Sequence, residues 1–441
     1  MLRPGHGSNF YNRVSVAMVV KSTAFLHLSD IHFRPQEAGY DMDQGLRTAI
    51  ENDIPVVREF LGEITGILVT GDIAYSGHPD EFRRAGEWLD KLCELAGCRR
   101  DRVWTTPGNH DVDRSYVRGK KSVRDFYAQV RKRGAPHVDT EINGAFKDEL
   151  GHRMLDSIRN YNDFAIRYGC DVTVECPHWQ QDIALNDGSI LKLWGLTSTL
   201  ISDENDHQDG GRLVIGSCQL GLPRQRGVET LTLCHHPLPW LLDQDTVETR
   251  LTAGTRVQLF GHKHSQRIQK IEETVRIIAG AVHPDRREHD WTPRYNAIAF
   301  DVVEDASGKQ LKVSTHLRVW NPETEQFVAD SVLAAPAGCR IDTLKLKDAG
   351  AGKAARATEA VADDDMRRLC YKFHVLDHAA RCATLEKLGI APAAGSSADL
   401  RFFRTSIQSL NKAKRLAELW DAINALMEDT EANPFAVRGE K

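Results

Sequence analysis

Five short apolar runs, each followed by polar residues that can bind metal ions, constrain the fold of this chain more than any other feature. Each run has the length and the apolar content of a buried β-strand. The runs with their polar blocks are 23–29 before Asp30 and His32, 66–70 before Gly71 and Asp72, 103–107 before Gly108 to Asp111, 231–234 before His235 to Pro237, and 257–260 before Gly261 to His264. Polar residues at the carboxyl ends of strands in α/β folds meet in one crevice. The sequence therefore predicts a single polar site.

Helical patterns between several of the runs, such as residues 80–93, indicate a layered α/β fold. Three further strands are expected at residues 275–279, 297–303 and 312–319. Residues 1–21 are expected to form an N-terminal tail, and the sequence leaves open whether Met1 or Met18 is the natural start.

The C-terminal part of the chain has a different composition. Residues 334–362 are rich in Ala, Gly and Lys without apolar periodicity, which predicts a linker. Residues 363–432 carry apolar faces at helical spacing and predict a small all-α domain.

Bulk properties exclude some classes of function. The net charge of −5 gives the chain no global attraction to nucleic acid or to an anionic membrane. Nine cysteines without a C-x-x-C pair indicate thiols in a reducing cytoplasm rather than a disulfide framework. The longest apolar stretch near the N-terminus is too short to span a bilayer, so no membrane association is expected.

The polar blocks supply what a two-metal phosphoesterase needs. Two ions roughly 3.5–4 Å apart can hold a phosphate and activate water, but they require a carboxylate placed between them. Asp30 and His32 lie two positions apart and can reach one ion together, as can His262 and His264. Asp72 follows Gly71, whose missing side chain we expect to leave room for a metal.

In these blocks the chain resembles the calcineurin-like metallophosphoesterases, whose pattern is D-x-H, G-D, G-N-H-[DE], H and G-H-x-H in that order. The resemblance covers roughly residues 22–320, within a predicted domain at 22–333, and implies an α/β sandwich of two β-sheets flanked by helices. It implies two divalent metal ions: one held by Asp30, His32 and His264, the other by Asn109, His235 and His262, with Asp72 between them. It also implies that His110 acts on the leaving oxygen or donates to the phosphate.

Several roles stay open. In the family this block reads His-x-Pro with its first His on the metal, so Pro237 implies that His235 is the ligand. His236 is then expected to line the substrate side, and direct binding of metal is the alternative. Asp111 either orients the catalytic His110 or caps the following turn. The mixed imidazole, carboxylate and amide donors suit manganese, iron or zinc without choosing among them.

Residues 113–190 are expected to be an insertion that folds as a cap over the site. Its first part contains Lys120, Lys121 and Arg124, which either bind substrate phosphates or form a solvated helix face. Arg286, in the loop after the G-H-x-H block, is a further candidate for substrate binding. The chain resembles the cyclic-nucleotide phosphodiesterase branch most, with nucleases and other phosphoesterases as alternatives.

Residues 363–432 loosely resemble the effector-associated, death-like helical adaptor domains of bacterial conflict systems, on the segments 369–381 and 416–423. The resemblance implies recruitment by a protein partner or self-association, as the effector of a defence or signalling pair. The alternatives are a helical appendage that packs on the core, and a chain that mainly senses a phosphate ligand.

Overall fold

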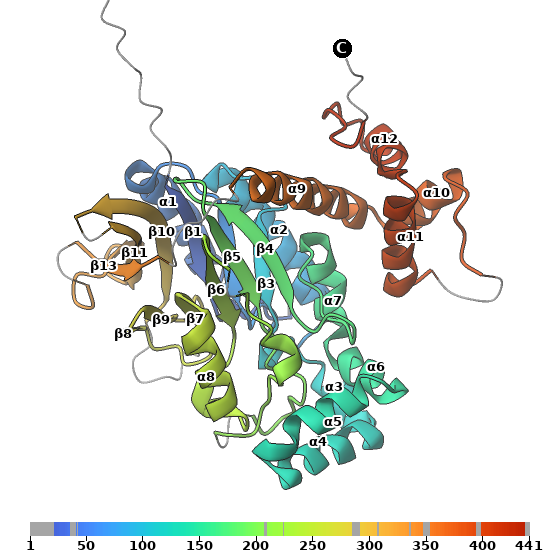
Figure 1. The fold of residues 1–441 in the computed structure, drawn as a ribbon, viewed down its shortest axis with the longest axis horizontal. Coiled ribbons are helices and arrows are strands. Elements are labelled where there is room, and N and C mark those ends of the chain that lie inside the picture. Colours follow the sequence, from blue (N-terminus) through green and yellow to red (C-terminus); the bar gives the residue numbers. More distant parts are fainter. Residues whose placement is uncertain are drawn as a thin grey trace, which may run out of the picture.

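The computed structural model describes residues 22–35, 41, 43–206, 210–223, 225–284, 292–306, 308–334, 337–346, 353–393 and 398–436, with the backbone alone at 353–363 (Figure 1). The expected N-terminal tail at 1–21 and Arg286 lie outside the described residues.

Two mixed β-sheets form the body of the molecule. The seven-stranded sheet has the order β12-β11-β10-β1-β2-β3, and β13 also pairs with β11. Its strands are β1 (Thr23–Leu28), β2 (Gly66–Thr70), β3 (Val103–Thr106), β10 (Arg294–Asp305), β11 (Gly308–Asn321), β12 (Gln326–Ala329) and β13 (Cys339–Lys345). The six-stranded sheet has the order β4-β5-β6-β7-β9-β8. Its strands are β4 (Trp179–Ala184), β5 (Ile190–Gly195), β6 (Val228–Cys234), β7 (Val257–Phe260), β8 (Arg267–Ile271) and β9 (Thr274–Ile278).

Apolar side chains on both faces of the central strands explain the layering. Every residue of β1, β2, β3, β6 and β7 is buried, as expected for strands covered on both sides. One apolar cluster joins residues of both sheets with α1 (Gln44–Leu61) and α2 (Pro79–Ala96), and a second lies beneath α8 (Gln244–Gly254). The expected α/β sandwich with flanking helices is confirmed.

The insertion after β3 is shorter than predicted. Helices α3 (Arg114–Gly119), α4 (Lys121–Arg133), α5 (Val138–Ala145), α6 (Glu149–Leu155) and α7 (Arg159–Ala165) form one helical group (Figure 1). The predicted boundary near residue 190 is wrong, because β4 at 179–184 already belongs to the six-stranded sheet, where it pairs with β5.

The predicted linker at 334–362 also needs correction. Strand β13 lies inside this range and pairs with β11 from Gln310↔Lys345 to His316↔Cys339. Helix α9 (Lys353–Val375) begins before residue 363. The remaining C-terminal helices are α10 (His378–Lys387), α11 (Leu400–Lys412) and α12 (Leu416–Met427). They share an apolar cluster around Trp420 with Leu369 and Phe373 of α9.

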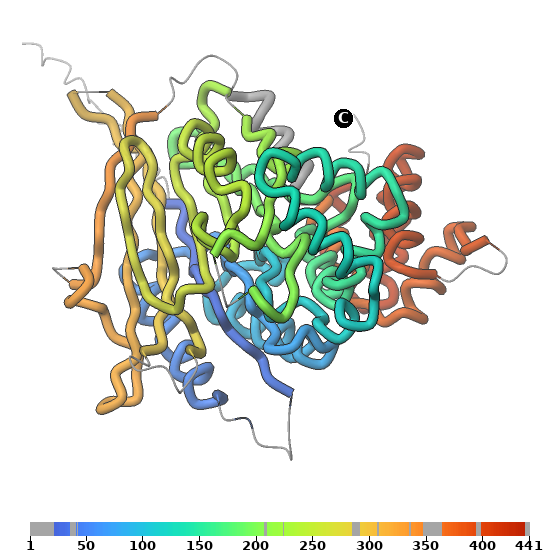
Figure 2. Tube along the Cα trace, turned by 90° about the horizontal axis from the view of Figure 1, so that it is seen from below, coloured from blue at the N-terminus to red at the C-terminus, as the bar shows by residue number. Residues whose placement is uncertain are grey.

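Helix α9 docks on the sandwich rather than lying apart from it (Figure 1). The guanidinium of Arg367 is buried, lies 4.9 Å from the Trp104 ring and donates to the carbonyl oxygen of Val103 at 3.2 Å. The Tyr371 hydroxyl donates to Asp90 of α2 at 2.8 Å. Figure 2 shows α10–α12 at the opposite end of the molecule from β10, β11 and β13.

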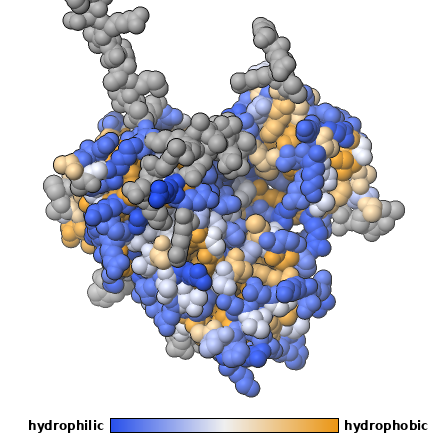
Figure 3. Space-filling model, in the orientation of Figure 1, coloured by the Kyte–Doolittle hydropathy of each residue, from blue (hydrophilic) through white to orange (hydrophobic). Residues whose placement is uncertain are grey.

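The face of the molecule in Figure 3 is hydrophilic over most of its area, with smaller apolar patches. Among the described residues, no helix combines the length and the apolar content needed to cross a bilayer. All nine cysteines are unpaired.

Candidate metal centre

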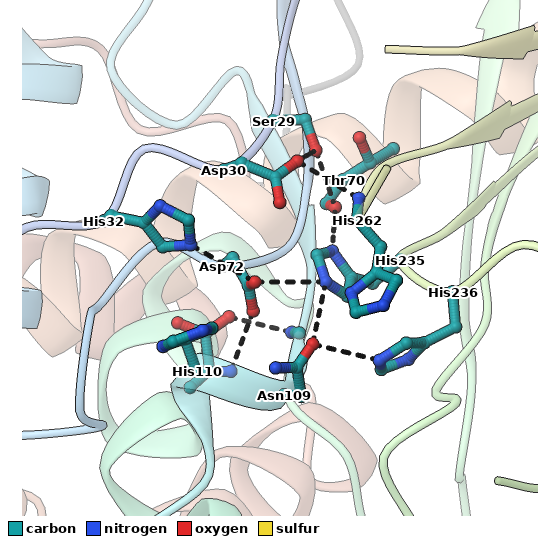
Figure 4. Close-up of polar contacts among 12 residues, drawn as sticks. Ser29, Asp30, His32, Thr70, Asp72, Asn109, His110, His235, His236 and His262 are labelled. Atoms are coloured by element: carbon teal, nitrogen blue, oxygen red, sulfur yellow. Dashed lines mark hydrogen bonds and ion pairs between the residues drawn. The ribbon is translucent and has the colours of Figure 1, made fainter. Parts of the chain in front are cut away.

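The site lies where five strands end. The polar blocks follow β1, β2 and β3 of one sheet and β6 and β7 of the other. The structure brings all seven predicted ligands together, and Figure 4 labels all of them except His264. These are Asp30, His32, Asp72, Asn109, His235, His262 and His264.

Three of them form a first group, in which the ligand atoms of Asp30, His32 and His264 lie within 4.8 Å of one another. Asp30 Oδ1 is buried, lies 3.2 Å from His264 Nε2 and accepts no well-formed hydrogen bond from the described residues. A buried carboxylate oxygen in this state is costly unless a cation occupies the space beside it.

A second group lies on the other side of Asp72 (Figure 4) and contains His235, His236 and His262, again within 4.8 Å. The amide oxygen of Asn109 joins it, at 3.2 Å from His235 Nε2 and 3.0 Å from His236 Nε2. The sequence analysis placed His236 on the substrate side, but the structure groups it with two metal-ligand candidates. Its fully buried ring contacts Asn109 with Nε2, and Ser198 Oγ with Nδ1 at 2.8 Å.

Asp72 stands between the two groups. Its Oδ2 lies 3.3 Å from His32 Nε2 and 3.2 Å from His235 Nε2, and its Oδ1 accepts the backbone amide of His110 at 2.8 Å. This is the position that a carboxylate bridging two ions requires.

Backbone carbonyls fix the two ligand imidazoles that face Asp72. His32 Nδ1 contacts the carbonyl oxygen of His283 at 3.1 Å, and His235 Nδ1 contacts that of Thr70 at 2.7 Å. A ring that donates from Nδ1 keeps the lone pair of Nε2 for a metal. The sequence gave no signal for these contacts, because they use main-chain atoms.

The site favours a positive charge at His235, whereas burial lowers the pKa of His262 to about 3. Burial acts to lower the pKa of His235, but the adjacent Asp72 carboxylate outweighs burial and raises this pKa to about 9. The proton on His235 supplies a positive charge beside Asp72. A metal ion in the same place would make the same contact with this carboxylate. The donor set, the bridging carboxylate and the orphaned Asp30 oxygen all fit a centre with two metal ions.

The ligand blocks adopt an unusual backbone conformation. Five of their residues have positive φ: Asp30 (53°), His32 (51°), Asp72 (51°), His262 (70°) and His264 (53°). Non-glycine residues rarely occupy this left-handed region, and clusters of them mark functional sites.

The role expected for Gly71 is corrected. A Cβ atom on Gly71 would lie 2.6 Å from His235 Nδ1. The glycine therefore leaves room for the neighbouring imidazole and not directly for a metal ion.

His110 lies at the mouth of the site, with its Nδ1 2.7 Å from the carbonyl oxygen of Tyr75. Burial lowers its pKa to about 4, so the ring is neutral near pH 7 and presents Nε2 as its second nitrogen. Asp111 does not contact this ring. Its carboxylate accepts the amides of Gly108 and Ala74, both at 2.8 Å, and so braces its own turn, whereas Asp113 caps the turn that follows.

The basic residues proposed for substrate binding are not close to the ligands. Lys120, Lys121 and Arg124 are exposed at the start of α4. Lys121 pairs with Asp125, and Arg124 donates to the carbonyl oxygen of Arg118. The structure does not bring these side chains to the metal centre.

Two aromatic residues beside the site were missed in the sequence. The ring of Tyr75 lies 5.3 Å from that of His110, with the Arg34 guanidinium 4.2 Å from the tyrosine ring. The ring of Trp240 lies 4.9 Å from that of His262, and Lys263 Nζ lies 4.8 Å from the tryptophan ring. Each aromatic follows a ligand block by a few residues, which is the only signal the sequence offers.

Comparisons with known proteins agree with this geometry. Residues 23–266 match the model of the calcineurin-like phosphoesterase family. The metallophosphoesterase-like protein YydB of Bacillus subtilis strain 168 is 34% identical over 95 residues, which are 21% of this chain and 18% of that relative. This chain thus spans less than a fifth of the length of that curated relative.

Solved structures with a similar arrangement share little sequence. GAP50 of Plasmodium is 9% identical, with 78% of this chain and 94% of that chain covered and a TM-score of 0.37. Zinc-bound Vps29 of Entamoeba histolytica is 10% identical, with 73% and 100% covered and a TM-score of 0.29. At these values neither likeness carries an argument about function. The family match, in contrast, covers more than half of the chain and contains every ligand block, so the chain belongs to the calcineurin-like phosphoesterases.

Proposed function

We propose that this phosphoesterase is a two-metal phosphodiesterase that acts on a nucleotide-type substrate. The observation that carries the proposal is the position of Asp72, whose Oδ2 lies within 3.3 Å of an imidazole nitrogen from each ligand group. When bound, two divalent ions supply Lewis-acid polarisation of the phosphate and activation of a water molecule. The donor types favour manganese, iron or zinc.

The residues of the chain itself complete this chemistry. His32 and His235 are held by carbonyl oxygens so that their Nε2 atoms face Asp72. His110, fixed by the Tyr75 carbonyl, has its Nε2 available to exchange a proton with an oxygen of the ester or to contact the phosphate.

The aromatic residues support a substrate that carries a base. Tyr75 is 36% exposed beside His110, and Trp240 is partly buried beside His262. Both rings have a cation over them, Arg34 and Lys263 respectively. Aromatic rings and guanidinium planes stack on nucleobases, with about 1–3 kcal/mol per base.

The test is a substrate panel on metal-loaded protein: bis(p-nitrophenyl) phosphate with manganese, then nucleotides, cyclic nucleotides, and single- and double-stranded DNA. Faster turnover of nucleotide-type diesters than of the model diester is expected, and Asp72→Ala should abolish both. An active enzyme that shows no preference for any ester with a base would overturn the nucleotide assignment.

A nuclease is the second candidate, favoured by the exposed cations of Lys120, Lys121 and Arg124. If α4 guides a polyanion, the triple replacement by Ser should raise KM for DNA and reduce its salt dependence, without changing hydrolysis of the model diester. Equal effects on both substrates would assign this segment to folding.

The C-terminal helices form part of the proposal as a recruitment element in the cytoplasm, binding a protein partner or a second copy. Val375, Leu426 and Met427 are 40%, 42% and 39% exposed and give α9 and α12 apolar surface. Light scattering on the full chain, with Leu426→Glu as comparison, tests self-association. If both proteins are monomers, a pull-down tests recruitment by a different protein. If the chain binds phosphate but hydrolyses no ester, a sensing role is favoured.

A further inference from the structure

Arg114 is the first residue of α3 and lies three positions after the turn that carries Asn109 and His110. Its Nη2 lies 3.5 Å from the carbonyl oxygen of Asn109, at the far limit of a hydrogen bond. The guanidinium therefore lies beside the metal centre.

Most of the hydrogen-bonding capacity of this guanidinium is unused. Arginine has five N–H donors, yet Arg114 Nε is buried without a partner among the described residues, and the contact to Asn109 is long. Other cations of the insertion are neutralised locally: Arg131 pairs with Asp203, and Arg133 pairs with Glu141. Within the described part of the chain, no carboxylate pairs with Arg114.

The backbone around Arg114 is held firmly. Asp113 caps α3 by accepting the amides of Ser115 at 2.9 Å and Tyr116 at 3.0 Å. The amide of Asp113 donates to the carbonyl oxygen of Ser157 at 2.8 Å. A cation carried by this firmly held backbone, next to a site for two dications, is repelled by them unless an anion lies between.

We infer that Arg114 binds a non-bridging oxygen of the substrate phosphate, on the side of the centre where Asn109 and His110 lie. The inference rests on the proposed function and deepens it, because it adds a guanidinium to the groups that recognise the phosphate. Charge-assisted hydrogen bonds from arginine to phosphate are about twice as strong as neutral ones, and two parallel bonds give directional recognition.

Arg114→Gln and Arg114→Lys test the inference, with Arg118→Gln as the matched control. Arg118 lies one turn further along α3, its side chain is 64% exposed, and its Nε is 3.9 Å from Glu204. Calorimetry with inorganic phosphate on metal-loaded protein should give binding about 10 to 100 times weaker for Arg114→Gln, in line with the loss of charge-assisted bonds. Arg118→Gln should stay within twofold of the parent.

Kinetics provide an independent measurement. For Arg114→Gln, kcat/KM for bis(p-nitrophenyl) phosphate should fall by a similar factor, and added guanidinium should restore part of it while urea should not. Arg114→Lys should keep an intermediate phosphate affinity, since it retains the charge and loses the fork.

Several outcomes would overturn the inference. Unchanged phosphate affinity in Arg114→Gln is one. Loss of bound metal from Arg114→Gln is another, because it would show that Arg114 only braces the Asn109 carbonyl. If the parent hydrolyses no phosphate ester but its phosphate affinity still depends on Arg114, the proposed function fails and this inference stands.

Discussion

Replacing Arg367 by alanine should destabilise the sandwich itself, although the residue lies in C-terminal helix α9. Arg367 as a whole is 6% exposed. Its guanidinium donates to the carbonyl oxygens of Val103 at 3.2 Å and Asp101 at 3.3 Å. It also donates to the carbonyl oxygen of Tyr168 and, at 3.1 Å, to Gln181 Oε1 of β4. One side chain thereby links α9 to strands of both sheets.

The magnitude follows from these contacts. Hydrogen bonds to charged groups contribute about 1.5–3 kcal/mol each, and a buried acceptor that loses its donor costs about 1–3 kcal/mol. The contacts are not additive, so we expect Arg367→Ala to lower the free energy of unfolding by about 3–5 kcal/mol, the range found when a buried charged partner is removed. At about 2–4 °C per kcal/mol for large domains, Tm should fall by about 6–20 °C.

Denaturant unfolding followed by tryptophan fluorescence measures this loss, because Trp104 lies 4.9 Å from the Arg367 guanidinium. Arg368→Ala is the matched control on the next position of α9. Its Nη1 pairs with Glu431 at 2.9 Å near the surface, and its loss should cost at most about 1 kcal/mol. If both variants unfold at the same denaturant concentration, α9 does not support the sandwich and the reasoning is refuted.

Three further outcomes are expected. Asp72→Ala should remove both metal ions, measured by elemental analysis under saturating manganese, and a variant that keeps two ions per chain would contradict the bridging role. His110→Ala should keep its metal content but lower kcat by about 10²–10⁴, and a change of only a few-fold would mean that the ring is not catalytic. Burial acts to raise the pKa of Asp364, but its bonds with Arg99 and its proximity to Arg102 lower this pKa on balance. The stabilisation of the folded state by Asp364 is therefore present at neutral pH and lost as pH falls below about 4. The difference in unfolding free energy between the parent and Asp364→Asn should therefore shrink from pH 7 to pH 3, and a constant difference would exclude this ion pair as its source.

The sequence was sufficient to predict the strands that carry the ligand blocks. Their apolar runs are buried on both faces, so they stand out from the neighbouring segments, and β1, β2, β3 and β7 begin and end within a residue or two of the predicted runs. The convergence of Asp30 and His264, which are distant in sequence, followed from the rule that strand ends in α/β folds meet in one crevice.

Edge strands and docked helices were harder to predict. In β13, Leu344 is buried but Ile341 is 58% exposed, so the alternation of a half-covered strand is obscured. Arg367 lies in a charged stretch and reads as a surface residue, because only tertiary structure supplies its carbonyl partners. For the same reason the interval at 334–362 resembled a linker. A chain that ended at the start of this interval would lose both β13 and the Arg367 contacts.

The strained ligand blocks explain how the centre is kept ready for metal ions. A left-handed conformation costs a non-glycine residue about 1–2 kcal/mol, and the surrounding structure must enforce it. The blocks enforce it on each other: the Asp30 amide donates to the Gly71 carbonyl at 3.1 Å, the His32 amide donates to that of Asp72 at 2.9 Å, and the His262 amide donates to Asp30 Oδ2 at 3.1 Å. These bonds use main-chain atoms and the outer carboxylate oxygen, so they leave Asp30 Oδ1 and the imidazole Nε2 atoms directed at the centre. The ligand geometry is therefore set by the sheets, and the free energy of metal binding is not needed to fold the site.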